Sequence, residues 1–453
     1  MDETNNSLVE KIVKDLNNVL SKPSASEFDI VPVESNRNKS PVLYRWTSVG
    51  LESWCVKHVY MECYKELMGN LTHPKRRLSK PSNHNYKRLT ALLNATLILN
   101  PDITTLWNMR REMVKQNFLE WESELHFTRL VLSRKPKCND AFMYRRWIFN
   151  DVLKGEVVHP ERFIDVLIAE EIKVCEKAAN KYPNNYHCWD HRRWLMITLE
   201  NIGYDVDYRR QYFQEYKFSE DWTSNHVSDY SCFHYRQFCL KKLYYMYEIW
   251  AEFKTMRNVN LRNNLRKVIA AHVLSDPAVK TSKIFTTIQE DDFIALVLGH
   301  RPSNCKCYDP YYDTCRKLEL LFFEIAQNDD MCKFYMNHET LWYHRRFIVH
   351  EILAAMYDHL EIERKNGKLV RKHIEAKPGE LLNKCENCLA GELKEHKGKV
   401  EKYDVQWVYH SILFKVLIKH EKEFIKDRQN NLDKYAMRHE HYLKYVEGLN
   451  DFI

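Results

Sequence analysis

The feature that most constrains the fold is a short motif that recurs along the chain, an aromatic residue followed three positions later by arginine. The five aromatic residues of the motif are Trp107, Phe142, Trp189, Phe233 and Trp342, and they stand 35, 47, 44 and 109 residues apart. The first three intervals have the length of helical hairpins in repeat proteins. We therefore predict an all-α chain, an α-solenoid of helical hairpins, with an insertion at about 250–325 that accounts for the long last interval.

Each copy of the motif opens the second half of a repeat. In the third copy, an apolar helical pattern over residues 169–181 is followed by Tyr182-Pro183-Asn184-Asn185, and a second helical pattern starts near Cys188. Proline ends a helix and asparagine caps the next one, so this polar stretch is read as the turn of the hairpin. A lone hairpin cannot bury its apolar faces, so neighbouring hairpins must stack.

Composition agrees with helices joined by short loops. The 453 residues include only 10 glycines and 13 prolines, on which sheets and tight turns depend, and 13% of them are aromatic. The net charge of +7 is small beside 69 basic and 62 acidic side chains. A general nucleic-acid binder is usually far more basic, so we expect no nucleic-acid partner.

The ends of the chain and its cysteines point to the reducing cytoplasm. The first six residues are polar and acidic, unlike a signal peptide, and no apolar run approaches the ~20 residues of a membrane helix. The last four residues lack a prenylation cysteine. Most of the 13 cysteines stand singly in helical patterns, where cysteine is a small buried group.

Four regions follow from these patterns. Residues 1–85 are expected to form a short helix, an extended strap and a further helix before a loop. Residues 86–360 hold the repeats. Residues 361–404 are strongly charged and contain four of the ten glycines, as a solvated insertion would. Residues 405–453 are read as capping helices, in which Gln406–Ser411 repeats the aromatic residue without the arginine.

Two roles are open for the repeated aromatic and arginine. Residues three and four apart share a helix face, so Trp189 lies beside Arg192 and Arg193. In a structural role, the aromatic residue fills the space between hairpins and the arginine reaches a carboxylate or a carbonyl of its neighbour. In a binding role, the histidine, tyrosine and arginine side chains face a polyanion from one surface.

A family resemblance enters at residues 183–194, Pro-Asn-Asn-Tyr-His-Cys-Trp-Asp-His-Arg-Arg-Trp. This segment resembles the repeat of the protein prenyltransferase α-subunit family, and the other four copies resemble it with variation. The resemblance covers roughly residues 50–350. It implies a right-handed superhelical solenoid that wraps around a helical-barrel β subunit, with zinc, the isoprenoid pocket and the thiolate chemistry mainly in that β subunit.

The resemblance also implies partners and site residues. The chain resembles most a member that pairs, as an α-type subunit, with the Rab geranylgeranyltransferase β subunit. The resemblance implies transfer of geranylgeranyl from its diphosphate to a substrate with a C-terminal cysteine, such as a lipidated SNARE or a Rab-type GTPase. Tyr186 takes the tyrosine position near the prenyl diphosphate, and Asn184 replaces the lysine found in relatives. His187, Arg192 and Arg236 are the further candidates for facing the diphosphate or the β subunit.

The residues themselves show no independent catalytic or metal site. A Gly-rich phosphate loop and a Gly-x-Ser-x-Gly motif are missing from the sequence. Cys305, Cys307, Cys385 and Cys388 have the wrong spacing for a zinc finger, so neither a metal nor a cofactor is expected in this chain. The leading hypothesis is a scaffold subunit of a protein geranylgeranyltransferase; the alternatives are a non-enzymatic helical-repeat scaffold and a self-sufficient enzyme.

Overall fold

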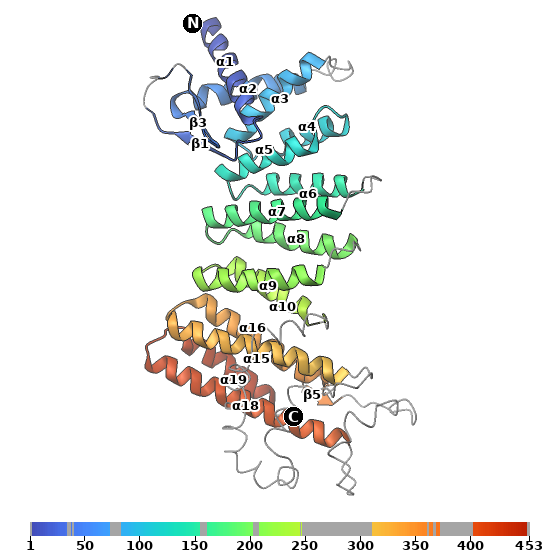
Figure 1. Ribbon diagram of the computed structural model, residues 1–453. Helices are drawn as coiled ribbons and strands as arrows, with labels where there is room; N and C mark the ends of the chain where they lie inside the picture. Colours follow the sequence, from blue (N-terminus) through green and yellow to red (C-terminus); the bar gives the residue numbers. More distant parts are fainter. Residues whose placement is uncertain are drawn as a thin grey trace. The chain divides into compact units, whose positions relative to one another are not determined.

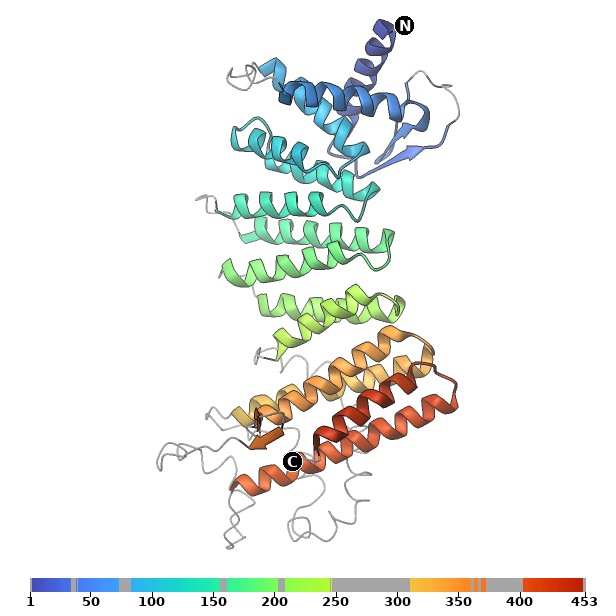
Figure 2. The same ribbon diagram turned by 180° about the vertical axis from the view of Figure 1, so that it is seen from behind.

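A computed structural model describes most of the chain. The described residues are 2–33, 38, 40–72, 83–154, 161–202, 208–244, 246, 310–359, 362–365, 368–371 and 402–450. They divide into two compact units, Met1–Val206 and Asp207–Ile453, each of which is taken by itself (Figures 1 and 2). Helical hairpins make up nearly all of both units, so the predicted all-α repeat fold is confirmed.

The first unit begins with a small sheet held among helices. Helix α1 (Asp2–Leu20) packs against α2 (Ser53–Thr72) and α3 (Asn83–Leu99). Between α1 and α2 lie β1 (Glu27–Val31), β2 (Val42–Arg45) and β3 (Ser48–Glu52), in the order β1-β3-β2. Strand β3 pairs in parallel with β1 and antiparallel with β2.

The predicted extended strap is therefore a three-stranded sheet. It buries Phe28, Val49 and Leu51, each at most 2% exposed, so it has a core of its own. Gly50 allows β1 to approach, because a Cβ atom there would lie 2.8 Å from a methyl group of Val31. Several of the residues predicted to form the following loop, 71–85, lie outside the described residues.

The repeats of the first unit form two layers. First helices α3, α5 (Trp121–Arg134) and α7 (Glu161–Lys181) contact one another in order, and second helices α4 (Thr104–Lys115), α6 (Asn139–Lys154) and α8 (Tyr186–Ile202) do the same. Each first helix also contacts its own second helix. Successive hairpins lie one below another in Figure 1.

The described residues of the second unit include three hairpins. They are α9 (Tyr208–Asn225) with α10 (Tyr230–Leu243), α15 (Pro310–Phe334) with α16 (Glu339–His359), and α18 (Lys402–Asn430) with α19 (Ala436–Asn450). Strands β4 (Ile362–Lys365) and β5 (Lys368–Arg371) form a two-stranded antiparallel sheet.

The two predicted insertions are described only in part. In the range 250–325, residues from Pro310 onward belong to helix α15, and the earlier ones lie outside the described residues. In the range 361–404, the described residues form β4, β5 and the start of α18. Cys305, Cys307, Cys385 and Cys388 are not among the described residues.

Three hairpin turns share a left-handed backbone residue. Asn184, Asn337 and Leu432 have φ of 54°, 64° and 62° in the turns that precede α8, α16 and α19. Asparagine tolerates this conformation better than other non-glycine residues, which agrees with its place in two of the turns. Asn185 does not cap α8 as predicted, because its side-chain oxygen accepts no hydrogen bond. Its side-chain amide nitrogen donates to the carbonyl oxygens of Pro136 and Ala178.

Two helices cover most of the region predicted as capping helices. Gln406–Ser411, which repeats the motif's aromatic residue without its arginine, lies inside α18, and α18 packs as the first helix of the last hairpin. The second helix of that hairpin is α19, where Met437 takes the place of the motif's aromatic residue.

Candidate functional site

The five aromatic residues of the motif lie in the core of the stack. Trp107, Phe142, Trp189, Phe233 and Trp342 are between 0% and 4% exposed. The Trp107 indole N–H donates to the carbonyl of Pro101 at 2.8 Å, and that of Trp342 donates to the Asp433 carboxylate at 3.2 Å. Their large rings fill the space between helices, and their polar atoms are satisfied at the hairpin turns.

The first arginine of the motif forms a buried ion pair with the next repeat. In each pair two guanidinium nitrogens bond the two oxygens of one glutamate on the following first helix, with N–O distances of 2.5–3.0 Å. We call these four pairs the arginine–glutamate ladder: Arg110–Glu124, Arg145–Glu171, Arg236–Glu324 and Arg345–Glu421. All eight side chains are at most 3% exposed.

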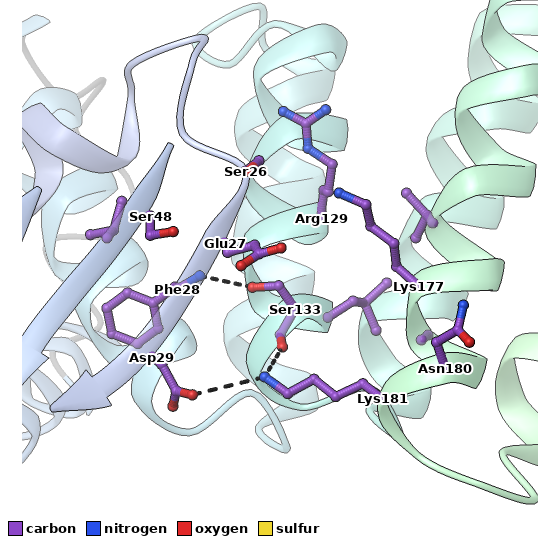
Figure 3. A pocket seen from close by; sticks show the side chains of 14 residues that line it. Ser26, Glu27, Phe28, Asp29, Ser48, Arg129, Ser133, Lys177, Asn180 and Lys181 are labelled. Atoms are coloured by element: carbon purple, nitrogen blue, oxygen red, sulfur yellow. Dashed lines mark hydrogen bonds and ion pairs between the residues drawn. The ribbon is translucent and has the colours of Figure 1, made fainter. Parts of the chain in front are cut away.

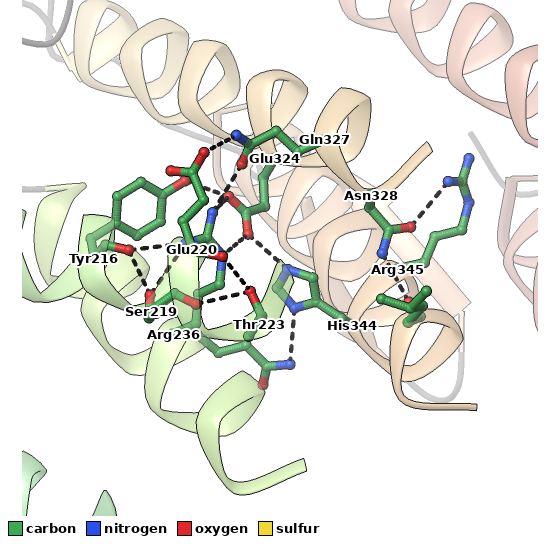
Figure 4. A network of polar contacts seen from close by, with 12 residues as sticks. Tyr216, Ser219, Glu220, Thr223, Arg236, Glu324, Gln327, Asn328, His344 and Arg345 are labelled. Carbon is green, nitrogen blue, oxygen red and sulfur yellow. Dashed lines mark hydrogen bonds and ion pairs between the residues drawn. The ribbon is translucent and has the colours of Figure 1, made fainter. Parts of the chain in front are cut away.

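Each ladder arginine also contacts the first helix of its own repeat. Arg145 donates to the Leu125 carbonyl at 2.7 Å and to the Thr128 hydroxyl at 2.8 Å. Arg236 donates in the same way to the Tyr216 carbonyl at 3.0 Å and to the Ser219 hydroxyl at 3.2 Å (Figure 4). One guanidinium therefore joins three helices, which fixes how consecutive hairpins stack.

A histidine or tyrosine on the second helix completes each site around a ladder glutamate. Tyr144 donates to Glu124 at 2.6 Å, and His191 lies 2.9 Å from Glu171. His344 and His439 occupy the same place, each 2.7 Å from a ladder glutamate. Each of these glutamates thus receives an arginine from the preceding repeat and a ring from its own.

The tautomer of His191 follows from its second partner. Arg146, which follows the ladder arginine in the sequence, donates from Nε to His191 Nδ1 at 3.3 Å. Nδ1 is therefore the acceptor, and Nε2 carries the proton that is donated to Glu171. Gln237 contacts His344 Nδ1 at 3.3 Å, so a side chain at the fifth position of the motif orients the histidine in both units.

Burial and the ion pairs act in opposite directions on these groups. Burial by itself would raise the pKa of Glu171, but Arg145 and His191 outweigh it and lower that pKa to about 2. Burial lowers the pKa of His191, and the opposing effect of Glu171 does not cancel the shift. The glutamate is thus ionised and the histidine neutral at pH 7.

Two predicted site residues belong to the interior. Arg236 is 3% exposed and bonded to Glu324, and Arg192 is 2% exposed. Neither side chain is at the surface, which argues against a direct contact of Arg192 or Arg236 with a partner. The buried pairs match the structural role that the sequence left open for the motif.

Tyr186 and His187, in contrast, lie at the surface of the first unit. Tyr186 is 59% exposed at the start of α8, and its ring packs edge-on against half-buried His187 with centroids 5.9 Å apart. One turn further along, Asp190 accepts from Arg146 of α6 at 2.7 Å. Helical spacing places Tyr186, His187 and Asp190 on one side of α8.

These residues belong to a continuous surface on two second helices. The Arg146 guanidinium lies 5.5 Å from the centre of the half-buried Trp194 ring, and Arg193 is exposed. We call this area the second-helix surface: Met143, Arg146 and Trp147 on α6, and Tyr186, His187, Asp190, Arg193 and Trp194 on α8. It combines one exposed and several half-buried aromatic groups with guanidinium groups, as protein-binding surfaces often do.

Sequence reasoning missed the ladder glutamates and the fifth motif position. Glu324 is the one ladder glutamate that stands alone in an apolar run, residues 320–325, and that isolation was an available signal. Glu124, Glu171 and Glu421 lie among other charged or polar residues, so their sequence surroundings gave no such signal. At the fifth position the five copies read Arg, Arg, Arg, Gln and Arg, whereas the fourth position is always arginine. The variable fifth position is the less buried of the two.

Among the described residues, no group of three or more His, Cys, Asp or Glu side chains is arranged to hold a metal ion. No helix there is both long enough and apolar enough to cross a membrane.

Comparison with known proteins matches the repeats one by one. The family model described as protein prenyltransferase alpha subunit repeat matches residues 121–151, 168–199, 212–243 and 321–352. Each match falls on one hairpin, from α5 with α6 to α15 with α16.

Curated proteins extend the similarity over most of the chain. Protein prenyltransferase alpha subunit repeat-containing protein 1 of Homo sapiens is 31% identical over 354 residues, which cover 75% of this chain and 77% of that protein. Protein prenyltransferase alpha subunit repeat-containing protein 1-B of Xenopus laevis is 30% identical over 362 residues, which cover 76% of this chain and 74% of that protein. Geranylgeranyl transferase type-2 subunit alpha of Mus musculus is 26% identical over 182 residues, 38% of this chain and 28% of the relative.

Proposed function

The chain belongs to the family of protein prenyltransferase alpha subunit repeat-containing protein 1, and from this premise we propose that it is the α-type subunit of a two-chain protein geranylgeranyltransferase. Its partner is a β subunit of the Rab geranylgeranyltransferase type, which holds the zinc ion and the geranylgeranyl diphosphate. Together they transfer geranylgeranyl to the C-terminal cysteine thiol of a substrate protein. The distant similarity to geranylgeranyl transferase type-2 subunit alpha supports this assignment.

The observation that carries the proposal is that the motif has a buried part and a surface part. The aromatic residue and the first arginine are buried inside the stack, where they pack and form the ladder. That leaves the second-helix surface, with Tyr186 59% exposed, for a partner. Tyrosine and arginine are enriched among the residues that dominate binding energy at protein interfaces.

The proposed role of this chain is to bind and orient, with the reaction carried out on the β subunit. Tyr186 offers a phenolic hydroxyl, and His187 beside it offers an imidazole, at the start of α8. Asn184, in the preceding turn, is neutral and held in a left-handed conformation, so it brings no positive charge to a diphosphate. The positive charge for the leaving diphosphate is therefore assigned mainly to the β subunit.

The test is co-expression with a Rab geranylgeranyltransferase β subunit, followed by size-exclusion chromatography and a transfer assay on a protein with a C-terminal cysteine. We expect a stable complex that is active, and a loss of affinity of about 10-fold or more for Tyr186→Ala and for Arg193→Glu. Tyr445→Ala matches Tyr186→Ala, because Tyr445 is 60% exposed on α19, and Lys57→Glu on α2 matches the charge reversal. Separate elution of the two chains would contradict the proposal.

A further inference from the structure

A cleft of about 520 Å³ opens in the first unit, where the small sheet meets the repeats (Figure 3). One wall consists of residues of β1 and β3 and of the segments beside them, and the other consists of α5 and α7. The sheet lies outside the matched repeats, whereas α5 and most of α7 lie inside them. The volume is within the range of about 300–1,000 Å³ that is usual for ligand sites.

Charges of opposite sign line the two walls. The strand side contributes the carboxylates of Glu27 and Asp29, and the helix side contributes the cationic groups of Arg129, Lys177 and Lys181. Buried apolar residues of α5 and α7, among them Leu132 and Val174, lie between the charged groups. The cleft thus offers an apolar floor between a positive and a negative side.

Lys181 is already used within the protein. Its ammonium group donates to the Ser133 carbonyl at 2.6 Å and lies 3.9 Å from the Asp29 carboxylate. The Ser133 hydroxyl in turn accepts from the backbone N–H of Phe28 at 2.9 Å. These contacts close one end of the cleft and hold β1 against α5.

Arg129 has donor capacity left over. Its Nη2 donates to the Ala25 carbonyl at 3.2 Å and to His126 Nδ1 at 3.0 Å, and its Nη1 lies 3.8 Å from Glu170. Its Nε is buried without a hydrogen-bond partner. A buried donor without an acceptor is costly, and a carboxylate oxygen entering the cleft would supply the acceptor.

Lys177 provides a second cationic group on the same wall. It is exposed on α7, and within the described part of the chain its ammonium group makes no hydrogen bond or ion pair. Figure 3 shows the Lys177 and Arg129 side chains extending from neighbouring helices into the region beside β1. A single anionic group can be held between a guanidinium and an ammonium group in this way.

The carboxylates on the strand side of the cleft limit the class of ligand that it can bind. A polyphosphate would be repelled by Glu27 and Asp29, and a purely cationic ligand would be repelled by Arg129 and Lys177. An extended peptide carries a carboxylate, apolar stems and basic side chains along one chain. We propose that this cleft binds an extended peptide segment of a partner protein, with a carboxylate on Arg129 and Lys177 and a basic side chain facing Glu27 and Asp29.

The test uses the purified full-length chain and a random octapeptide library with free C-termini. We expect the wild-type chain to enrich peptides that contain both an acid and a base, and Lys177→Glu to weaken the binding of a labelled selected peptide by about 10-fold or more in fluorescence anisotropy. Lys115→Glu is the matched control, because Lys115 is exposed on α4, away from the cleft, and should leave the affinity unchanged. A selected peptide whose acid is replaced by lysine should regain affinity for Lys177→Glu.

Two arms identify the source of the carboxylate: replacing Glu or Asp in the selected peptide by Gln or Asn, and amidating its C-terminus. The one change that abolishes binding shows whether a side chain or the chain end is bound. The proposal is overturned if the wild-type chain enriches no peptide over Lys177→Glu. It is also overturned if inorganic phosphate raises the melting temperature of the wild-type chain but not of Lys177→Glu while no peptide is enriched, because the cleft would then bind a simple anion. Lys177 is an exposed residue, so its replacement tests the cleft without endangering the fold.

Discussion

Two adjacent arginines of one motif lie in two different regions of the molecule. Arg145 is 2% exposed and tied to Glu171 inside the stack, whereas the side chain of Arg146 is 16% exposed on the second-helix surface and tied to Asp190. The two residues have the same chemistry, and they differ in what surrounds them. An arginine in a recurring motif is therefore no evidence for ligand binding until its burial is known.

The buried and the surface ion pairs also differ in how much stability is lost when one partner is removed. A buried pair has a high desolvation cost, so its net contribution is small, but removal of one partner leaves an uncompensated buried charge. In a partly exposed pair such as Arg146–Asp190, each charge keeps some contact with water when its partner is removed. The ladder should respond strongly to single substitutions, and the surface pairs should respond weakly.

The largest expected effect comes from the ladder itself. Glu171→Ala leaves Arg145 and His191 without their shared carboxylate, and we expect the free energy of unfolding of the first unit to fall by about 3–5 kcal/mol. Urea unfolding followed by circular dichroism measures it. Glu170→Ala is the control, because Glu170 is the preceding residue but is 44% exposed and should cost about 0.5 kcal/mol or less. Equal losses for the two variants would remove the distinction between interior and surface.

The motif's aromatic residue should be as sensitive. Trp189 is 4% exposed, and Trp189→Ala should leave a large cavity and lower the free energy of unfolding by about 3–5 kcal/mol. The melting temperature by differential scanning calorimetry is the readout. Trp46 is 82% exposed, so Trp46→Ala should melt with the wild type. An unchanged melting temperature for Trp189→Ala would refute its role in packing.

Acid should destabilise the first unit through Glu171 and His191. The folded-state pKa of Glu171 is lowered to about 2, so its contribution is complete above pH of about 5 and is lost as the pH falls toward 2, up to about 3 kcal/mol. The pKa of His191 is also lowered, so the unfolded chain gains a proton there first, and stability starts to fall below pH of about 6.5. Melting temperatures between pH 3 and 8 should fall more steeply for the wild type than for Glu171→Gln. Parallel curves would show that Glu171 is not ionised in the folded chain.

The smallest expected effect comes from the second arginine. Arg146→Gln removes the ion pair to Asp190 and the contact with Trp194, but glutamine can still donate to His191 Nδ1, as Gln237 does to His344. We expect a loss of about 1 kcal/mol or less. Chemical denaturation is the measurement, with Arg145→Gln as the interior counterpart. A loss as large as that of Arg145→Gln would place Arg146 in the ladder.

Much of the fold could be predicted from the sequence, because the motif and its spacing are local signals. The hairpins of 121–199 follow from the aromatic residues and the polar breaks between helical patterns. The sheet of residues 27–52 could not be predicted, because its strands are short and β1 and β3 pair in parallel across an intervening segment. Its stability comes from contacts with α1, α2 and α5, which no local pattern encodes.

The site was harder to predict for a geometric reason. On a helix, the third and fourth residues after Trp189 lie at similar angles on either side of it. Either arginine could therefore be the buried one, and the packing of the next hairpin decides which. The exposed position of Tyr186 and the buried position of Arg236 depend on the same contacts between repeats.

The ladder also has a direction, since each of its arginines bonds forward to the first helix of the next hairpin. In the second unit, the fourth motif position of α19 is Glu440, which bonds Gln429 and Lys444. A hairpin added after α19 by design would therefore need an arginine in place of Glu440 and a first helix that carries the glutamate to receive it.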